Sequence, residues 1–173
     1  MHRKSFEDMN CPVARSLERV GEWWSILILR DAFAGLTRFD DFQKHLGIAP
    51  NILTRRLATL VDAGMMERRS YSERPPRDEY VLSARGRDFH DVLLALLAFG
   101  NRHFAPEGES VLVVDAITGA PADPVVVDRR SGRRLAGPDY KLTAGPAAVA
   151  KQLAAEKQAT DATAQLKRKE VSQ

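Results

Sequence analysis

The sequence predicts a mainly α-helical fold with a small β unit, on three observations. Residues 38–62 carry the periodicity of two short helices, separated by the tight turn Leu46-Gly47-Ile48-Ala49-Pro50. Residues 65–82 follow as two strand-like segments around a loop that contains two prolines. Residues 83–103 then resume a helical period. Helix, turn, helix and hairpin in this order indicate a winged helix-turn-helix, so we predict mainly α structure with a small β wing.

Two further helices precede this unit. The segment Pro12–Val20 predicts a short helix with Val13, Leu17 and Val20 on one side. Residues 22–34 predict a second helix, which is apolar nearly all round. A helix with that pattern is typical of the centre of a core, so we expect it to be buried.

The helix-turn-helix has its own start and stop signals. Thr37 is placed to cap the helix that begins at Phe39. Gly47 can adopt the positive φ that ends this helix, and Pro50 suits the first position of the next one. In that next helix one face is apolar and the opposite face is polar. The inward residues are Leu53, Leu57, Leu60 and Val61, and the outward ones are Asn51, Arg55, Thr59 and Asp62, with Thr54 and Arg56 on the flanks.

The wing and the last long helix follow. Met65–Tyr71 and Arg77–Leu82 are the predicted strands, and the two prolines between them predict a stiff loop. Ser83 can cap a helix running to about His103. The apolar stripe of this helix is wide, which favours a second helix partner from another subunit.

Composition changes at Pro106, and we predict three parts: residues 1–105, 106–146 and 147–173. The middle part is expected to form a small β-hairpin that pairs Val111–Val114 with Val125–Val127, followed by a turn at Asp128–Gly132. The last part is rich in Ala, Lys and Gln, and its weak helical pattern fades by Thr160. It predicts a marginal helix ending in disorder.

The charge of the 173-residue chain is concentrated in the helix-turn-helix and wing. Residues 38–77 hold eight Lys or Arg against five Asp or Glu, an excess equal to the net charge of +3 for the whole chain. One cysteine excludes an intramolecular disulfide, the N-terminus lacks a signal-peptide pattern, and the apolar runs are too short to span a bilayer. We expect a soluble, cytoplasmic protein that does not bind membranes.

A winged helix-turn-helix reads DNA through the N-terminal half of its second helix, and this predicts a contact surface. Asn51 and Arg55 are candidates for base contacts, because they can pair with adenine and guanine edges. Thr54, Arg56 and the backbone N–H groups near Pro50 are candidates for phosphate contacts. The predicted surface also includes Arg38 and, along the wing, Arg68, Arg74 and Arg77. The alternative is a solvated basic face paired with Glu67, Glu73 and Glu79.

A set of ordered motifs carries a family resemblance. They are Cys11-Pro12-Val13, the stretch from Gly21 to Asp31, Arg38-Phe39-Asp40-Asp41-Phe42, Leu53-Thr54-Arg55-Arg56-Leu57 and Pro75-Pro76-Arg77-Asp78-Glu79-Tyr80. Together they resemble the HxlR-type transcriptional regulators, a winged-helix group close to the MarR type, from about Cys11 to Phe104. The resemblance implies a homodimer whose first and last helices form the interface. Each recognition helix would meet one half of a palindromic operator.

The resemblance also bears on Cys11 and on metals. In several relatives a cysteine just before the first helix senses electrophiles or oxidants, and Cys11 holds that position. The alternative is a small buried hydrophobe. In some members the C-terminal extension carries cysteines at two turns, where this chain has Thr118-Gly119 and Asp128–Gly132. Without thiols there, and with four scattered histidines, we predict no metal site and no cofactor.

We therefore predict a homodimeric DNA-binding transcriptional regulator, a repressor of nearby genes that responds to a small molecule or a reactive electrophile. The chain has no Gly-rich phosphate loop, no metal-binding His-Glu pair and no nucleophile elbow, so an enzyme is not expected. The alternative is a winged helix that binds a protein partner and has no specific DNA site.

Overall fold

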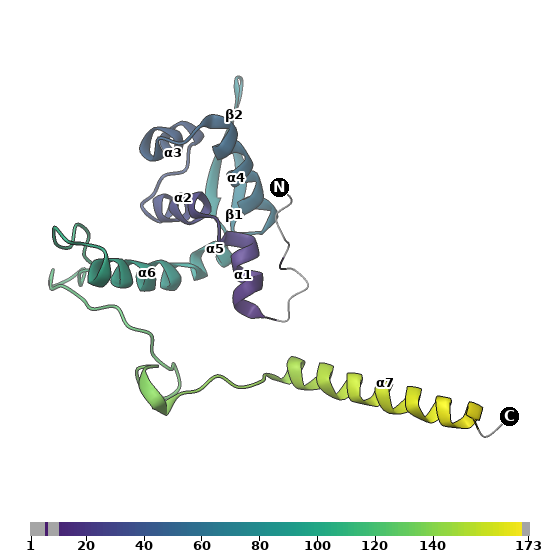
Figure 1. Ribbon diagram of the computed structural model, residues 1–173. Helices are drawn as coiled ribbons and strands as arrows, with labels where there is room; N and C mark the ends of the chain where they lie inside the picture. Colours follow the sequence, from purple (N-terminus) through teal and green to yellow (C-terminus); the bar gives the residue numbers. More distant parts are fainter. Residues whose placement is uncertain (1–5, 7–10, 171–173) are drawn as a thin grey trace. The chain divides into compact units, whose positions relative to one another are not determined.

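The computed structural model describes residue 6 and residues 11–170, with side chains up to residue 158. The chain divides into two compact units, one ending at Val126 and the other beginning at Val127. The first unit contains the helix-turn-helix and the wing, which stand out as a bundle of helices with a projecting hairpin (Figure 1). The prediction of a mainly α fold with a small β wing is confirmed.

From α1 to the end of the wing, the elements of the first unit occur where the sequence predicts them, with small shifts at their ends. The order is α1 (Pro12–Val20), α2 (Trp23–Phe33), α3 (Phe39–Leu46), α4 (Pro50–Asp62), β1 (Met66–Glu73), β2 (Pro76–Leu82), α5 (Ala84–Asp88) and α6 (His90–His103). None of the helices in the described part of the chain is long and apolar enough to cross a membrane.

The core lies between α2, α3, α4 and the base of the wing. Ile28 and Leu29 of α2 are fully buried, as expected for a central helix. Phe42 of α3 and Leu57 of α4 pack into the same cluster. The first residue of β1, Met66, closes it. Because α4 contributes its apolar face to this core, its polar face is held outward on a rigid support.

The turn between α3 and α4 follows the predicted chemistry, but the start of α3 does not. Gly47 has φ of 61°, and Pro50 is the first residue of α4. The expected cap at Thr37 is wrong: the residue before α3 is Arg38, and no side chain caps this helix. Thr37 instead accepts a hydrogen bond of 2.7 Å from the Tyr80 N–H through its carbonyl oxygen. That bond ties the start of α3 to β2.

The long helix predicted from Ser83 to His103 is two helices, broken at Phe89. The Ser83 hydroxyl accepts the Gly86 N–H at 3.0 Å, so the predicted cap is confirmed. Gly86 lies against the carbonyl of Met65, where an added Cβ would come within 2.0 Å of the oxygen. The Phe89 N–H then bonds the Gly86 carbonyl, three residues back. This tighter turn ends α5 before α6 begins.

The predicted hairpin of Val111–Val114 with Val125–Val127 does not form. Within the first unit, Val114 pairs with Pro121 in an isolated bridge. The Asp115 carboxylate accepts the N–H groups of Ile117 and Thr118 at 3.0 and 2.7 Å. These bonds close the turn so tightly that the chain pairs with itself before it reaches Val125. They also favour the charged carboxylate, which lowers the pKa of Asp115.

The second unit repeats this turn chemistry. Asp128 accepts the Arg130 N–H at 3.1 Å and the Ser131 hydroxyl at 2.6 Å, and these bonds lower its pKa. Val127 pairs with Arg134 across this turn. A short 3-10 turn at Gly137–Asp139 precedes α7 (Pro146–Glu170). The tail is therefore helical to Glu170 and does not fade at Thr160, whereas residues 171–173 lie outside the described part. The predicted three-part division stays a prediction.

Candidate nucleic-acid interface

Helix α4 is buried in the core on one side and exposes a polar face to solvent on the other. Leu53, Leu57 and Leu60 are fully buried on one side. Asn51 and Arg55 are exposed, and Thr54 beside them is exposed too. The Thr54 hydroxyl donates to the Pro50 carbonyl at 2.9 Å, which turns it back along the helix. The structure therefore brings the two predicted base-contact residues together on one accessible face.

The N-cap residue of α4 does not cap the helix with its side chain, but one backbone N–H group of the first turn is already hydrogen-bonded. Ala49 precedes the helix and has no side chain that could cap it, and Pro50 is exposed. The Ile52 N–H donates to the Asn51 Oδ1 at 2.9 Å. An anion seated here would therefore compete with the Asn51 side chain for one of the N–H groups.

Arg56 lies apart from the other candidates, on the side of α4 that faces α2. Its Nε is 2.8 Å from Oε2 of Glu22, and the two side chains are only 17% and 19% exposed. The same Oε2 accepts the Trp24 N–H at 3.1 Å and so caps α2. The Arg56 Nε is buried and makes no hydrogen bond of good geometry within the described part of the chain. Its position three residues after Leu53 is the sequence signal that it borders the buried face.

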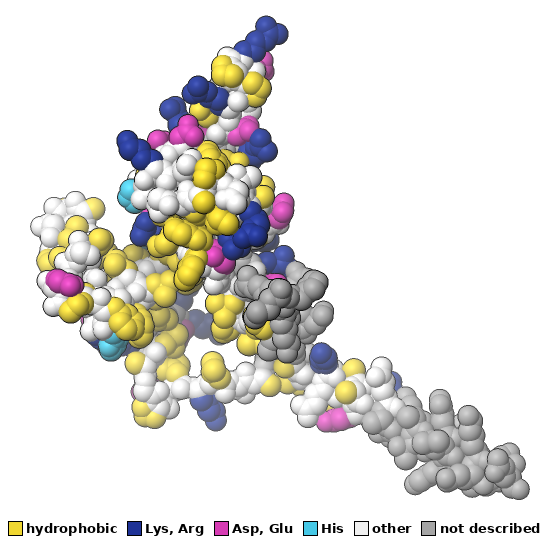
Figure 2. Space-filling model, turned by 45° about the horizontal axis from the view of Figure 1, so that its top comes forward, with side chains coloured by type: hydrophobic (Ala, Val, Ile, Leu, Met, Phe, Trp, Pro, Cys, Tyr) yellow, Lys and Arg dark blue, Asp and Glu magenta, His cyan; other side chains and the backbone are white. Residues whose placement is uncertain are grey.

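The wing carries the remaining basic residues. Its strands pair antiparallel from Met66 opposite Leu82 to Glu73 opposite Pro76, with an irregularity between Ser70 and Ser72. Figure 2 shows Lys and Arg side chains along this projection, with acidic side chains among them. Arg74 and Arg77 lie at its exposed end, and no ion pair to a described residue holds either of them. They are accessible to a polyanion.

Two other wing arginines are partnered. The Arg68 Nε donates to Asp78 at 2.9 Å, and this hydrogen bond raises the pKa of Arg68 above its ordinary value. Arg69 pairs with Glu67 at 2.7 Å. Of the acids named in the alternative of a solvated basic face, Glu67 forms an ion pair, with Arg69, whereas the candidate Arg68 pairs with Asp78. Arg38, before α3, lies over the ring of Tyr71 at 5.0 Å from its centroid and so packs against β1.

The sequence did not predict the buried acidic residue in the central helix, which contacts the helix-turn-helix. Asp31 of α2 is 1% exposed, and it contacts the Nδ1 of His45 at 2.7 Å and the Nε of Arg30 at 2.9 Å. Because His45 belongs to α3, this contact joins α3 to the central helix. The sequence signal is an Arg-Asp pair inside a mostly apolar helix.

Cys11 is a free thiol of intermediate exposure at the N-cap of α1. No group of three or more His, Cys, Asp or Glu in the described part of the chain could hold a metal ion.

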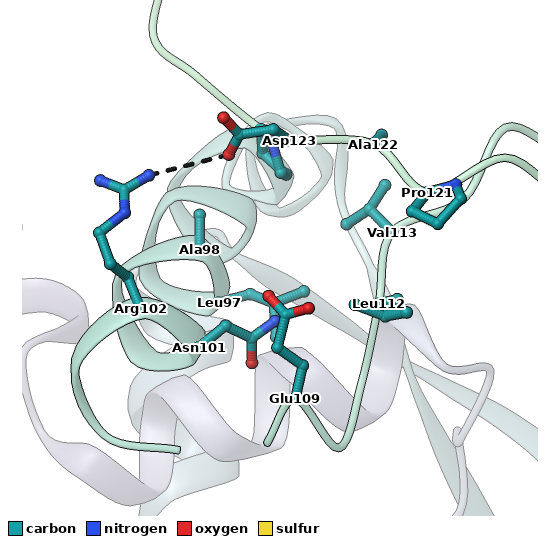
Figure 3. A pocket seen from close by; sticks show the side chains of 11 residues that line it. Leu97, Ala98, Asn101, Arg102, Glu109, Leu112, Val113, Pro121, Ala122 and Asp123 are labelled. Carbon is teal, nitrogen blue, oxygen red and sulfur yellow. Dashed lines mark ion pairs between the residues drawn. The ribbon is translucent and has the colours of Figure 1, made fainter. Parts of the chain in front are cut away.

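The surface of the first unit has a groove and a pocket beside its helices. A groove of about 870 Å³ runs between α1 and the α5–α6 segment, with Val13, Leu17, Val92 and Leu96 among its lining residues. A smaller pocket of about 350 Å³ lies between the end of α6 and the segment 109–124 (Figure 3). Neither is lined by Asn51, Thr54 or Arg55 of α4.

Comparisons with known proteins agree with this architecture. Residues 19–108 match the family model described as HxlR-like helix-turn-helix. An uncharacterized HTH-type transcriptional regulator of Mycobacterium tuberculosis, Rv3095, is 36% identical over 140 residues, which cover 80% of this chain and 89% of that protein. A crystal structure of PA1607, a candidate transcription factor, is 40% identical with a TM-score of 0.73, and the match covers 82% of this chain and 100% of that one.

A third match concerns a protein with a described response. The oxidized form of the redox regulator HypR is 29% identical with a TM-score of 0.50, covering 54% of this chain and 96% of that one.

Proposed function

The chain belongs to the HxlR-like helix-turn-helix family of transcriptional regulators, and from this premise we propose that it binds a specific DNA site as a homodimer and represses nearby genes. Repression is the simplest outcome for a compact dimer, because occupation of an operator blocks polymerase without further contacts. The proposed operator is a palindrome, since a two-fold symmetric dimer presents the same recognition helix twice.

One observation carries the proposal: α4 is fixed in the core by Leu53, Leu57 and Leu60 and exposes Asn51 and Arg55 on its other side. Asparagine pairs with the N6 and N7 edge of adenine, and arginine with the O6 and N7 edge of guanine. We assign sequence recognition to these two residues.

We assign backbone contacts to residues around this face. Thr54 and the N-terminus of α4 near Pro50 adjoin Asn51 and are suited to phosphate. On the wing, Arg74 and Arg77 are the accessible cations, and Arg38 and Arg68 supply charge although Tyr71 and Asp78 partner them. Such contacts give affinity and register but little sequence information.

The proposed function is tested by fluorescence anisotropy with the full-length protein. DNA from upstream of its own gene and of neighbouring genes is compared with scrambled duplex at several salt concentrations. We expect specific DNA to bind at least about 1,000-fold more tightly, and affinity to fall steeply with salt, by about 0.9 in log–log slope for each phosphate contact. Equal affinity for both duplexes would contradict the proposal.

The dimer is proposed to form through α1 and α6. These helices expose Val13, Leu17, Val92, Leu96 and Phe99, of which Val13 is 66% exposed. A contiguous apolar surface of this kind is unfavourable in water, and a second copy would cover it. Four of these residues, Val13, Leu17, Val92 and Leu96, line the groove between α1 and α6, where helices of the partner could pack.

Leu96→Asp is expected to convert the dimer to a monomer, because it puts a charge into the apolar contact. Light scattering measures the molar mass of the protein in solution, which should be half that of the wild type. Affinity for the operator should fall by about 100-fold, since a monomer loses the avidity of the second half-site. Ile117→Asp is the matched control, because Ile117 is 95% exposed and does not line the groove. A Leu96→Asp protein that stays dimeric would exclude this interface.

We further propose that Cys11 makes DNA binding sensitive to oxidants or electrophiles. Its support is the thiol's partial exposure at the start of α1 and the similarity to the redox regulator HypR. Because the chain has one cysteine, its disulfide would form with a second subunit or with a small thiol. Modification at this end of α1 would change the dimer contact and so the spacing of the recognition helices.

Cys11→Ser is expected to bind the operator with wild-type affinity and to keep it when diamide is added, whereas the wild type releases it. Gel-shift titration with and without diamide measures both. If the diamide-treated Cys11→Ser protein still releases DNA, the Cys11 thiol is not the sensor.

A further inference from the structure

The pocket between α6 and the segment that follows it has the size and chemistry of a small-ligand site. Its volume of about 350 Å³ falls at the lower end of the range for ligand pockets, about 300 to 1,000 Å³. All of its lining residues belong to the first unit. The Asn101 side chain donates to the Val111 carbonyl at 2.9 Å, which holds the returning segment against the helix.

The pocket has an apolar wall and a polar side. Figure 3 shows Leu112, Val113 and Pro121 on one side, and on the other side α6, which contributes the polar Asn101 and Arg102 beside Leu97 and Ala98. Such a division orients a ligand that has an apolar body and a polar group at one end.

The charges on the polar side favour a cation. Arg102 and Asp123 face each other at 3.8 Å, so that their charges largely cancel (Figure 3). Glu109 then remains, and no ion pair within the described part of the chain engages its carboxylate. An ammonium group placed beside Glu109 would gain charge-assisted hydrogen bonds with its carboxylate. An anion would gain only Arg102 and would be repelled by two carboxylates.

We propose that this pocket binds a small amphipathic amine, with the ammonium group at Glu109 and the apolar body against Leu112, Val113 and Pro121. The site lies on α6, whose exposed Val92, Leu96 and Phe99 form the proposed dimer surface. Occupation of the pocket can therefore change how α6 meets its partner, and this part of the inference rests on the proposed function. Binding itself does not require DNA.

The test uses phenethylamine as the probe and isothermal titration calorimetry with the full-length protein in the absence of DNA. 2-Phenylethanol and 3-phenylpropionate are the neutral and anionic comparisons. We expect saturable binding of the amine, at least about fivefold weaker binding of the alcohol, and none of the acid. Glu109→Gln should weaken amine binding about fivefold to tenfold, as expected for one partly exposed charged contact. Glu107→Gln is the matched control, because this nearby acid does not line the pocket.

The proposal is overturned if the amine does not bind, if the alcohol binds equally well, or if Glu109→Gln binds the amine as the wild type does. The calorimetric result stands whether or not the protein binds DNA, so failure of the pocket and failure of the DNA-binding proposal are distinguishable.

Discussion

Arg56→Ala is expected to lower the free energy of unfolding by about 2 kcal/mol and to weaken DNA binding without changing its salt dependence. The substitution leaves the Glu22 carboxylate, 19% exposed, without its cation and removes the contact between α4 and the start of α2. Glu22 also caps α2 through the Trp24 N–H, so the pair fixes one helix against the other. The measurements are urea denaturation and operator binding at several salt concentrations.

The salt dependence separates two roles of this arginine. A phosphate contact would make the log–log slope smaller by about one when it is removed, whereas a positioning residue would leave the slope unchanged. Glu22→Gln tests the same contact from the other side and should be non-additive with Arg56→Ala. If Arg56→Ala reduces the slope, and if its effect on the free energy of unfolding adds to that of Glu22→Gln, then Arg56 contacts DNA and does not position α4 through Glu22.

Arg55→Ala is expected to lower affinity for the operator by about 5-fold to 150-fold, equivalent to about 1 to 3 kcal/mol, and to relax the preference at one base position in each half-site. Arg55 is exposed on the outward face of α4, next to Thr54, and its loss exposes no buried partner. Stability should therefore change by less than about 0.5 kcal/mol. Competition with operators mutated at single positions measures the change of preference.

Arg74→Ala is the contrasting variant, because Arg74 lies at the end of the wing and is proposed to contact the DNA backbone. It should weaken binding to operator and scrambled DNA by the same factor and reduce the salt slope by about one. If the two variants behave alike, the division of roles between α4 and the wing is wrong.

The local structure of the helix-turn-helix could be predicted because its signals are local. Gly47 supplies the positive φ of the turn, and Pro50 begins α4, as the sequence indicates. The buried series Leu53, Leu57 and Leu60 follows from helical spacing alone. The exposure of Asn51 and Arg55 follows from the same period. Such features depend on neighbours in the chain, which the sequence displays directly.

The contacts that sequence reasoning missed join residues far apart in the chain. Glu22 and Arg56, and Asp31 and His45, meet only when α2 packs against α4 and α3. Periodicity can place Arg56 at the edge of the buried face, but it cannot name Glu22 as its partner. The same applies to Thr37, whose cap role was expected from local pattern and which instead bonds β2 through its carbonyl.

The extension after α6 shows a different source of error. Valine-rich segments favoured one hairpin, but the chain instead forms two separate turns, within which Asp115 and Asp128 make hydrogen bonds. Each aspartate closes a separate turn. Val114 therefore pairs with Pro121 across the first turn, and Val127 pairs with Arg134 across the second.

The central claim is that two α4 helices of a dimer read one palindromic DNA site. The most direct measurement is a hydroxyl-radical footprint of the full-length protein on DNA upstream of its own and neighbouring genes. We predict two protected half-sites with related sequences, centred about 10 base pairs or a multiple of that apart, and their loss with Arg55→Ala. Protection that is absent, or that is the same on scrambled DNA, would contradict the claim and favour a winged helix that binds a protein partner.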